Sequence, residues 1–385
     1  MLKSLSKYVG IIVVLCLALP ATARQVIIPA PPQLAASSYL LIDADTGREL
    51  VSHNVDERLP PASLTKMMTS YIVSGEIENG QMKESDLVNI SVRAWKMGGS
   101  KMFIKEGTQV PVGELLHGVI IQSGNDASVA LAEHVAGSEE AFVDVMNQQA
   151  QLLGMSHTEF HNATGWPAEG HLTTARDLSL LAKAIIQDHP EHYKIYSQKY
   201  FKFNGINQPN RNKLLWRDKA VDGLKTGHTE EAGYCLVSSA KKNGMRLIAV
   251  VLGTRSEEAR AAESQKLLAY GFRYFETHKV YQQGDVLNTA KVWAGQSEQV
   301  ELSIAEDIFL TIPRGAREDL KAELHIDQTI KAPLTQGQQL GRLTVMLDED
   351  QLVDTPLVAK QAVEPAGFFA RIWDAVLLFF HGLFG

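Results

Sequence analysis

Apolar residues recur with strand or helix spacing from residue 38 to about residue 277. Residues 39–42 and 49–51 flank Asp45-Thr46-Gly47, which predicts a β-hairpin. Residues 233–240 and 245–253 are two further apolar strands, joined by a Lys-Lys-Asn-Gly sequence suited to a tight turn. Helical spacing covers residues 63–77, 113–121, 127–135, 139–153 and 257–275, and another helix is expected from Thr174, where Asp177 gives capping-box spacing. An α+β domain over residues 38–277 is therefore expected, with helices and an antiparallel sheet.

Residues 278–363 have a different pattern. Short apolar runs such as 300–302, 308–312 and 342–347 alternate there with Gly, Pro and Asp. This pattern predicts a small all-β domain. Because no charged constellation stands out in it, we expect a role in spacing or interaction.

Residues 364–385 contain a third kind of pattern, in which large apolar residues recur at helical spacing. Arg371, Asp374 and His381 interrupt the apolar run, and at 1.5 Å per residue the segment 367–385 barely reaches across a bilayer. An amphipathic helix lying on a membrane surface is therefore expected, with Phe and Trp side chains near the headgroups. The alternative is a helix docked on the protein's own core.

The N-terminus has the three parts of a secretory signal peptide. Lys3 and Lys7 precede an apolar stretch over residues 9–19, and Ala21-Thr22-Ala23 supplies small residues for cleavage. We therefore expect residues 1–23 to be removed on export and residues 24–37, rich in Pro and Ala, to form a leader. A retained N-terminal anchor is disfavoured because the apolar stretch is too short to span a bilayer.

Composition excludes several classes of protein. The hydrophobic fraction of 45% and the charged fraction of 21% are those of an ordinary globular chain. The formal net charge of −7 with no basic stripe argues against nucleic-acid binding. Cys16 and Cys235 are the two cysteines and neither has metal-site spacing to histidines, so no metal or other cofactor is expected.

Ser63-Leu64-Thr65-Lys66 is the first candidate for chemistry. A hydroxyl and an amine three residues apart share one face of a helix's first turn. A serine nucleophile needs a base, and lysine serves only if its pKa is lowered, by the helix N-terminus or by a second lysine nearby. The Ser-x-x-Lys pattern is weak alone, because four copies occur in this chain.

Two further motifs follow in order along the chain. Ser123-Gly124-Asn125 lies between two predicted helices, where a glycine turn offers both side chains to one cleft. Lys225-Thr226-Gly227 occurs once, just before the strand hairpin. Lys225 and Thr226 suit an anionic group, and Gly227 would let a substrate backbone approach closely. Each motif alone is compatible with an ordinary loop, but the ordered triple is far more specific.

This triple, in the contexts Pro61–Lys66, Gln122–Ala127 and Asp222–His228, resembles the penicillin-binding serine transferases. More narrowly, the chain is similar to the low-molecular-mass D-alanyl-D-alanine carboxypeptidases of bacterial cell-wall metabolism. The likeness runs from the signal peptide to the amphipathic tail. It implies a penicillin-binding/β-lactamase-like transpeptidase domain, followed by the small all-β domain and the C-terminal helix.

The resemblance also implies an activity and a set of site residues. The enzyme would remove the terminal D-alanine from peptidoglycan pentapeptide stems, and β-lactam antibiotics would be covalent inhibitors. Ser63 would attack, Lys66 would be the base and Ser123 would relay a proton. Asn125 would contact a peptide amide of the substrate, and Lys225 and Thr226 would bind its terminal carboxylate. The backbone N–H groups of Ser63 and His228 would bind the oxyanion, with Gly227 beside them. Arg260 would lie near the carboxylate. Export would place the enzyme at the periplasmic face of the inner membrane.

Three alternatives to a carboxypeptidase stay open. A β-lactamase would need a glutamate that activates water, and Glu159 lies near the expected position without the full motif, in a segment that looks like a strand. An endopeptidase that cuts cross-linked peptides would use the same catalytic residues. A non-catalytic membrane-bound scaffold is disfavoured because every motif residue is intact.

Overall fold

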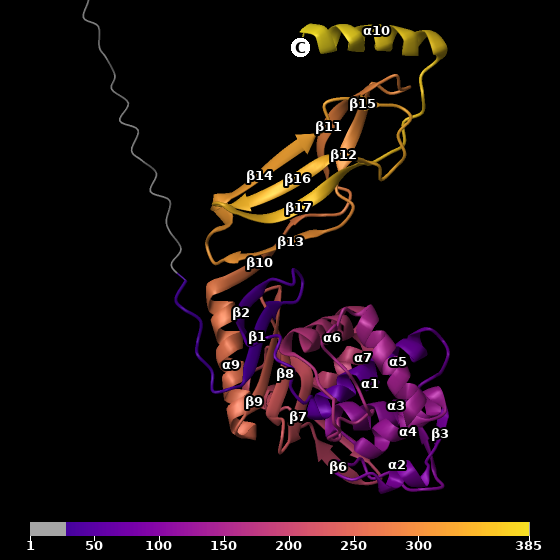
Figure 1. Cartoon of the computed structure of the whole chain (residues 1–385), viewed down its shortest axis with the longest axis vertical. Helices are drawn as coiled ribbons and strands as arrows, with labels where there is room; N and C mark the ends of the chain where they lie inside the picture. Colours follow the sequence, from indigo (N-terminus) through magenta and orange to yellow (C-terminus); the bar gives the residue numbers. More distant parts are fainter. Residues whose placement is uncertain (1–27, 385) are drawn as a thin grey trace, which may run out of the picture.

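The computed structural model describes residues 28–384, and the expected signal peptide therefore lies outside the described residues. An α+β domain is followed by a narrower β-rich domain, and one helix lies at the far end of the molecule (Figure 1). This is the predicted fold class. The two domains follow one another lengthwise, so the C-terminal helix is remote from the helical part of the first domain.

The first domain is organised by a five-stranded antiparallel sheet in the order β2-β1-β9-β8-β7. Both predicted hairpins are present in this sheet. Its strands are β1 (Ser38–Asp43), β2 (Glu49–His53), β7 (Val221–Thr229), β8 (Gly233–Lys242) and β9 (Met245–Thr254). Strand β7 is an edge strand, and its free edge faces the helices (Figure 1).

Alternation along the strands explains why the sheet has a core on each face. Leu40 and Val250 pack into the larger core with the helices, whereas their neighbours Leu41 and Val251 pack with helix α9 (Glu257–Tyr274). The larger core is formed with α1 (Lys66–Glu78), α2 (Val92–Lys96), α3 (Val112–His117), α4 (Asn125–Ala136), α5 (Glu139–Leu152), α6 (Ala175–Asp188) and α7 (Pro190–Tyr193). The sheet is thus a central layer between one long helix and a helical cluster.

Three predictions for this domain need correction. The helix expected over residues 63–77 starts as a 3-10 turn, η1 (Ala62–Thr65), before α1 begins. The α-helix expected over residues 113–121 is shorter, because α3 ends at His117 and a π-helical turn, η2 (Gly118–Gln122), follows. The Lys225-Thr226-Gly227 motif lies inside β7, because this stretch pairs with β8 and does not form a loop before it.

Several short helices and strands of this domain were not predicted from the sequence. The hairpins β3 (Leu87–Asn89) with β4 (Gln109–Pro111) and β5 (Tyr200–Phe203) with β6 (Ile206–Pro209) pair over three or four residues. Two further short elements are the 3-10 turn η3 (Lys194–Ser197) and helix α8 (Leu214–Arg217). Runs this short carry little periodicity in the sequence.

The second domain is all-β, as its alternating pattern predicts. One sheet has the order β14-β16-β17-β12-β11-β15, and β10 pairs separately with β13. The strands are β10 (Phe275–Tyr281), β11 (Val286–Trp293), β12 (Gln299–Ser303), β13 (Ile308–Pro313), β14 (Leu320–Ile326), β15 (Ile330–Lys331), β16 (Gln339–Leu347) and β17 (Asp350–Ala359), with a 3-10 turn η4 (Arg317–Asp319). The boundary expected between residues 277 and 278 falls inside β10.

The β1–β2 hairpin joins the two domains through polar contacts. Thr277 Oγ1 donates to Asp43 Oδ2 at 2.6 Å, and the hydroxyls of Thr46 and Thr311 lie 2.7 Å apart. Arg48 Nη1 donates to the Thr311 carbonyl at 2.6 Å. Strands β10 and β13 therefore rest on the turn of the first hairpin as well as on the end of α9.

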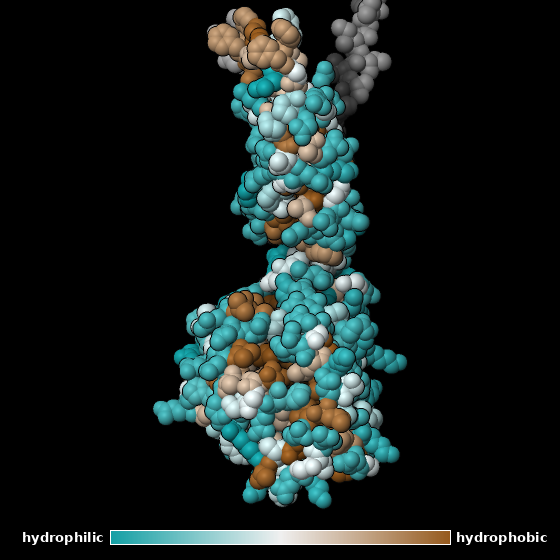
Figure 2. Space-filling view, turned by 90° about the vertical axis from the view of Figure 1, so that its right-hand side faces the viewer, coloured by the Kyte–Doolittle hydropathy of each residue, from teal (hydrophilic) through white to brown (hydrophobic). Residues whose placement is uncertain are grey.

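Helix α10 (Phe368–Phe384) crosses the end of the β-rich domain (Figure 1). The Ala294 N–H donates to Asp374 Oδ2 at 2.7 Å, which ties the helix to that domain. Most of its large apolar side chains up to Phe380 are exposed, with Phe369 at 85%, and they form the apolar cap at one end of the surface (Figure 2). The helix therefore contacts the β-rich domain through Asp374, but its exposed apolar side chains are not packed into a core as the docked alternative would require. Within residues 28–384, none of the helices combines the length and apolar character needed to cross a membrane.

The predicted N-cap of α6 gives a test of the fold. Thr174 is buried and its Oγ1 accepts the Asp177 N–H at 3.1 Å, so Thr174→Ala should lower the free energy of unfolding by about 1 kcal/mol. Thr174→Ser keeps the acceptor oxygen and serves as the matched control. Denaturant unfolding measures both variants, and an alanine variant as stable as the serine variant would contradict the assignment.

Candidate active site

Ser63 and Lys66 meet where η1 passes into α1. Lys66 Nζ lies 3.1 Å from Ser63 Oγ, as the three-residue spacing predicts. Lys66 is 1% exposed, whereas Ser63 is partly exposed between buried neighbours. The hydroxyl is therefore open to a substrate while its partner amine is shielded from water.

Ser123 and Lys225 form a second pair, brought together from two distant segments. Ser123 follows η2 and has a left-handed backbone with φ of +65°, a conformation uncommon for a residue with a side chain. Lys225 Nζ on β7 donates to Ser123 Oγ at 2.8 Å and to the Thr226 carbonyl at 3.1 Å. The edge strand is thereby connected to the helical half of the domain.

Asn125 opens helix α4, two residues after Ser123. Its side-chain amide donates to the Gly98 carbonyl at 2.7 Å, and its backbone N–H donates to the Ser100 carbonyl at 2.7 Å. Asp126 next to it is buried and accepts the Met102 N–H at 2.9 Å, among other backbone donors of the same loop. These contacts hold the loop over residues 98–104 against the start of α4.

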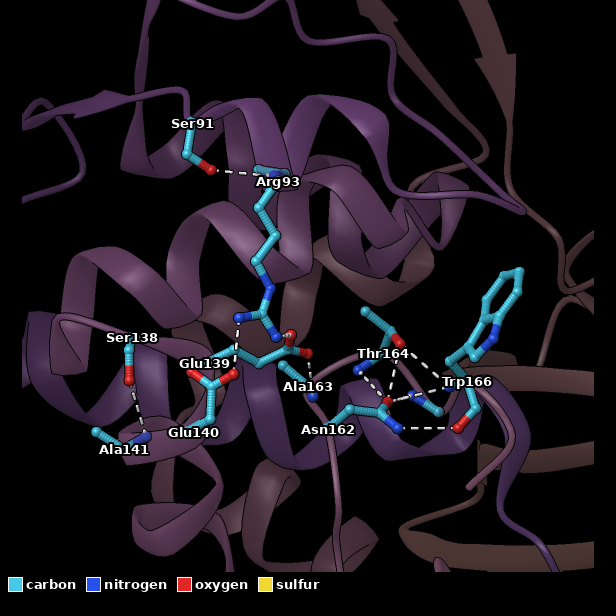
Figure 3. Close-up of polar contacts among 12 residues, drawn as sticks. Ser91, Arg93, Ser138, Glu139, Glu140, Ala141, Asn162, Ala163, Thr164 and Trp166 are labelled. Carbon is cyan, nitrogen blue, oxygen red and sulfur yellow. Dashed lines mark hydrogen bonds and ion pairs between the residues drawn. The ribbon is translucent and has the colours of Figure 1, made fainter. Parts of the chain in front are cut away.

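The loop over residues 162–166 supplies a contact that the sequence did not predict. Asn162 Oδ1 accepts the N–H groups of Thr164, Gly165 and Trp166 at 2.8–3.1 Å, so one side chain folds the loop (Figure 3). The Thr164 carbonyl then accepts a hydrogen bond from Lys66 Nζ. The amine is thus held between this carbonyl and the Ser63 hydroxyl.

A buried carboxylate anchors the same loop from behind. Glu139 accepts the Ala163 N–H at 3.0 Å and pairs with Arg93 at 2.7 Å, and Arg93 also pairs with Glu140 at 2.7 Å (Figure 3). Ser91 and Ser138 cap helices α2 and α5, which carry these residues. The position of the Thr164 carbonyl therefore depends on α2 and α5 as well as on the loop itself.

Two glycines allow the loop and the edge strand to approach Ala62, the residue before Ser63. Gly165 has φ of +80°, and a Cβ at this position would lie 1.7 Å from the Ala62 carbonyl oxygen. A Cβ on Gly227 would lie 3.0 Å from the Pro61 carbonyl oxygen and 3.3 Å from the Ala62 Cβ. The space that we expected Gly227 to leave for a substrate backbone is therefore occupied by the chain itself.

Burial controls the protonation of both lysines. It lowers the pKa of Lys66 to about 7, and the carboxylate of Asp126 opposes this shift. Burial also lowers the pKa of Lys225 well below its usual value, with Lys66, Arg260 and Arg211 adding to the effect. The lowered pKa of Lys66 was expected, but its main cause is desolvation and not the helix terminus.

The remaining predicted residues lie on or against β7. Thr226 is buried, and the exposed His228 ring stacks on Tyr234 with centroids 3.9 Å apart. Arg260 is 5% exposed and donates to the Gly227 carbonyl at 3.0 Å. Arg260 is thus a buried group beside the strand, and its guanidinium also lies 3.8 Å from the carboxylate of Glu257.

Glu159 lies apart from this constellation. The strand expected around it reduces to a single bridge with Leu172, and its exposed carboxylate contacts His161 at 3.1 Å and Arg58 at 3.8 Å. In the part of the chain that the structure describes, no cluster of His, Cys, Asp or Glu could hold a metal ion.

Sequence reasoning missed three contributors: Asp126, Asn162 and the Thr164 carbonyl. The run Asn162-Ala163-Thr164-Gly165 contains residues that favour tight turns, so a turn could have been predicted. The contact of the Thr164 carbonyl with Lys66 could not have been predicted. Every residue has a backbone carbonyl, so the residue type gives no indication of such a contact, and the two segments are far apart in the chain.

Two family models match the chain. The model described as D-alanyl-D-alanine carboxypeptidase matches residues 25–256, and the model described as penicillin-binding protein 5, C-terminal domain, matches residues 275–365. The D-alanyl-D-alanine carboxypeptidase DacA of Escherichia coli is 46% identical over 366 residues, which cover 93% of this chain and 91% of that protein. The DacC carboxypeptidase of the same organism is 45% identical over 92% of this chain and 90% of its own length.

Solved structures show the same similarity. Penicillin-binding protein 5 of Haemophilus influenzae superposes with a TM-score of 0.84 at 43% identity, covering 87% of this chain and 99% of that chain. Penicillin-binding protein D2 of Listeria monocytogenes, solved in its ampicillin-bound form, matches with a TM-score of 0.59 at 30% identity, covering 63% of this chain and 100% of that chain. The predicted resemblance is confirmed: the chain belongs to the D-alanyl-D-alanine carboxypeptidase family of serine peptidases.

Proposed function

We propose that Ser63 is the nucleophile of a serine-type D-alanyl-D-alanine carboxypeptidase and that neutral Lys66 is its base. The observation that carries the proposal is the 3.1 Å contact between Lys66 Nζ and Ser63 Oγ in a water-shielded position. A neutral amine has one lone pair and two N–H groups. Because the Thr164 carbonyl accepts one N–H, the lone pair can face the Ser63 hydroxyl and take its proton.

Bond changes at the substrate follow from this arrangement. Ser63 Oγ bonds to the carbonyl carbon of the penultimate D-alanine, and the peptide C–N bond then breaks. Ser123 relays the proton that Lys66 took from Ser63: the Ser123 O–H proton goes to the departing amine and the proton from Lys66 replaces it, while Ser123 Oγ accepts a hydrogen bond from Lys225. Water then cleaves the Ser63 ester, which releases the shortened peptide and restores the hydroxyl.

Specificity for a free C-terminus would come from β7. Lys225 and Thr226 bind the terminal carboxylate, and Arg260 adds positive potential through the strand from its site at the Gly227 carbonyl. Burial disfavours the charged form of Lys225 in the empty site, and an incoming carboxylate restores its charge. A substrate without that carboxylate would therefore bind to β7 with lower affinity.

The developing oxyanion would be stabilised by two backbone N–H groups, those of Ser63 and His228, each worth about 3–4 kcal/mol. Strand β7 can supply such a donor because only one of its edges is paired in the sheet. Asn125 binds a peptide amide of the substrate. Its fixed contact with the Gly98 carbonyl orients this side chain.

The carboxypeptidase is favoured over the alternatives by the extent of the similarity. The carboxypeptidase relatives match over both domains, whereas a D-alanyl-D-alanine endopeptidase of Pseudomonas aeruginosa is 31% identical over 66% of this chain. A β-lactamase mechanism lacks support because Glu159 is engaged elsewhere. β-Lactams would instead acylate Ser63 as inhibitors.

The proposal includes the place of action. Removal of residues 1–23 on export would deliver the enzyme to the periplasm, and α10 would hold it on the membrane surface through its exposed apolar side chains. Peptidoglycan pentapeptides are the substrates there. The β-rich domain would separate the active site from the membrane, in keeping with the lengthwise arrangement of the domains (Figure 1).

The first test is release of D-alanine from an acyl-Lys-D-Ala-D-Ala tripeptide by residues 24–366. Ser63→Ala should reduce release about 10³-fold or more, because it removes the attacking oxygen. Ser197→Ala, at an exposed serine, is the matched control and should retain full activity. Equal activity of the Ser63 variant and its control would refute the assignment, as would a penicillin adduct still formed by Ser63→Ala.

The lowered pKa of Lys66 predicts a pH profile. Protonated Lys66 cannot accept the Ser63 proton, so kcat/KM for D-alanine release should fall about tenfold per pH unit below about pH 7 and level off above it. A histidine could mimic this limb. The fall in kcat/KM below about pH 7 should therefore persist in the His228→Gln variant. His171 is not its source, because burial lowers the pKa of His171 to about 4. A limb that disappears in His228→Gln would contradict Lys66 as its source.

Gly165 tests the loop that holds Lys66. Gly165→Ala should lower D-alanine release about 100-fold, because the collision with the Ala62 carbonyl displaces the reacting groups. Gly154→Ala is the matched control: its φ of +76° is equally unfavourable for alanine, but nothing lies within 4 Å of the added Cβ. The control should lose about 1 kcal/mol of stability and no activity. Equal activity of the two variants would argue against this role of the loop.

A further inference from the structure

A cavity of about 680 Å³ lies between α10 and the adjoining end of the β-rich domain. The domain contributes Trp293 of β11 and Lys331 of β15, and the helix contributes Phe368, Arg371 and Ile372. This cavity is far along the molecule from the helical cluster that holds Ser63 (Figure 1). None of its residues belongs to the active site.

Cationic groups from separate elements converge on this cavity. Lys331 and Arg371 are exposed, and within the part of the chain whose side chains are described neither forms an ion pair with a carboxylate. Lys291 Nζ lies 3.7 Å from the centre of the Trp293 ring, which adds a third cation beside the cavity. The carboxylate of Asp374 is already engaged by the Ala294 N–H. This hydrogen bond leaves the carboxylate charged, but Lys331 and Arg371 are two cations against this one anion, so the lining carries a net positive charge.

The other part of the cavity is apolar and continuous with the exposed face of the helix. Phe368, Ile372 and Phe379 line it, and these side chains are 70%, 49% and 66% exposed. Figure 2 shows this end of the molecule as an apolar cap above a mostly hydrophilic body. A site with basic groups beside an apolar surface is complementary to an amphiphile with an anionic head.

We propose that this cavity binds the phosphate headgroup of an anionic phospholipid. The inference rests on the proposed attachment of α10 to the membrane and adds a preference for lipid charge. With α10 in the interface, the adjoining end of the β-rich domain would lie next to the headgroup layer, because Asp374 of the helix is hydrogen-bonded to Ala294 of that domain. Lys331 and Arg371 then hold one phosphate between the domain and the helix, which would fix the angle between them.

The test compares binding of residues 24–385 to phosphatidylcholine vesicles and to vesicles that also contain phosphatidylglycerol, by flotation. The wild type should prefer the anionic vesicles, and Lys331→Gln with Arg371→Gln should reduce affinity for them about 30-fold, as expected for two basic side chains at an anionic surface. Arg317→Gln with Lys321→Gln removes the same charge from exposed positions on η4 and β14, and this control should keep the preference.

The Ala375→Phe variant distinguishes binding of a headgroup in the cavity from general electrostatic attraction to an anionic surface, because it fills the cavity without changing the charge of the protein. It should lower the ratio of binding to anionic over neutral vesicles. An unchanged ratio in both cavity variants would overturn the headgroup site while leaving attachment intact. Failure of the wild type to bind either vesicle would overturn attachment itself. Displacement from anionic vesicles by inorganic phosphate at equal ionic strength would reassign the site to free phosphate. All variants should release D-alanine from a soluble tripeptide normally.

Discussion

The amine of Lys66, enclosed between the Ser63 hydroxyl and the Thr164 carbonyl, is the group on which the rest of the active site depends. A lysine in water is almost entirely protonated at neutral pH and cannot act as a base. Burial lowers the pKa of Lys66 to about 7 and makes the neutral amine available. Enclosure has a structural cost, since polar atoms that lose water must find partners in the protein. The Thr164 carbonyl is such a partner.

Much of the helical half of the first domain supports this enclosure. Asn162 folds the loop, Glu139 holds it from behind, and Gly165 lets it lie against Ala62 without a side chain in between. On the opposite side, Asp126 fastens the loop over residues 98–104 and moderates the pKa of Lys66. Ser63, the proposed nucleophile, thus stands on a short helical turn whose surroundings are fixed from several elements, as a pre-organised site requires.

The edge strand β7 joins the sheet to the helices and brings Lys225 and Thr226, the proposed carboxylate-binding residues, close to Ser123. Among the described strands none pairs with its outer edge, and the turn that carries Ser63 packs against the strand at Gly227. The Lys225–Ser123 hydrogen bond closes the remaining gap. The β-rich domain and α10 lie away from this region, so the proposed membrane attachment would not disturb the reacting groups (Figure 1).

The sequence by itself determined the long elements, the order of the two domains, the exposed tail and the residue types of the three motifs. These are local properties: periodicity, turn residues and short spacings act over a few positions, and the Ser63–Lys66 contact follows from one helical turn. The tertiary structure decided that Lys225 lies in a strand and bonds to Ser123, that Gly227 accommodates the chain itself, and that burial is the main cause of the lowered pKa of Lys66. It also decided that Thr164 acts through its backbone. Such features depend on segments that are about 100 or more residues apart in the chain. Contacts at that separation are set by packing of the whole domain, which no local pattern encodes.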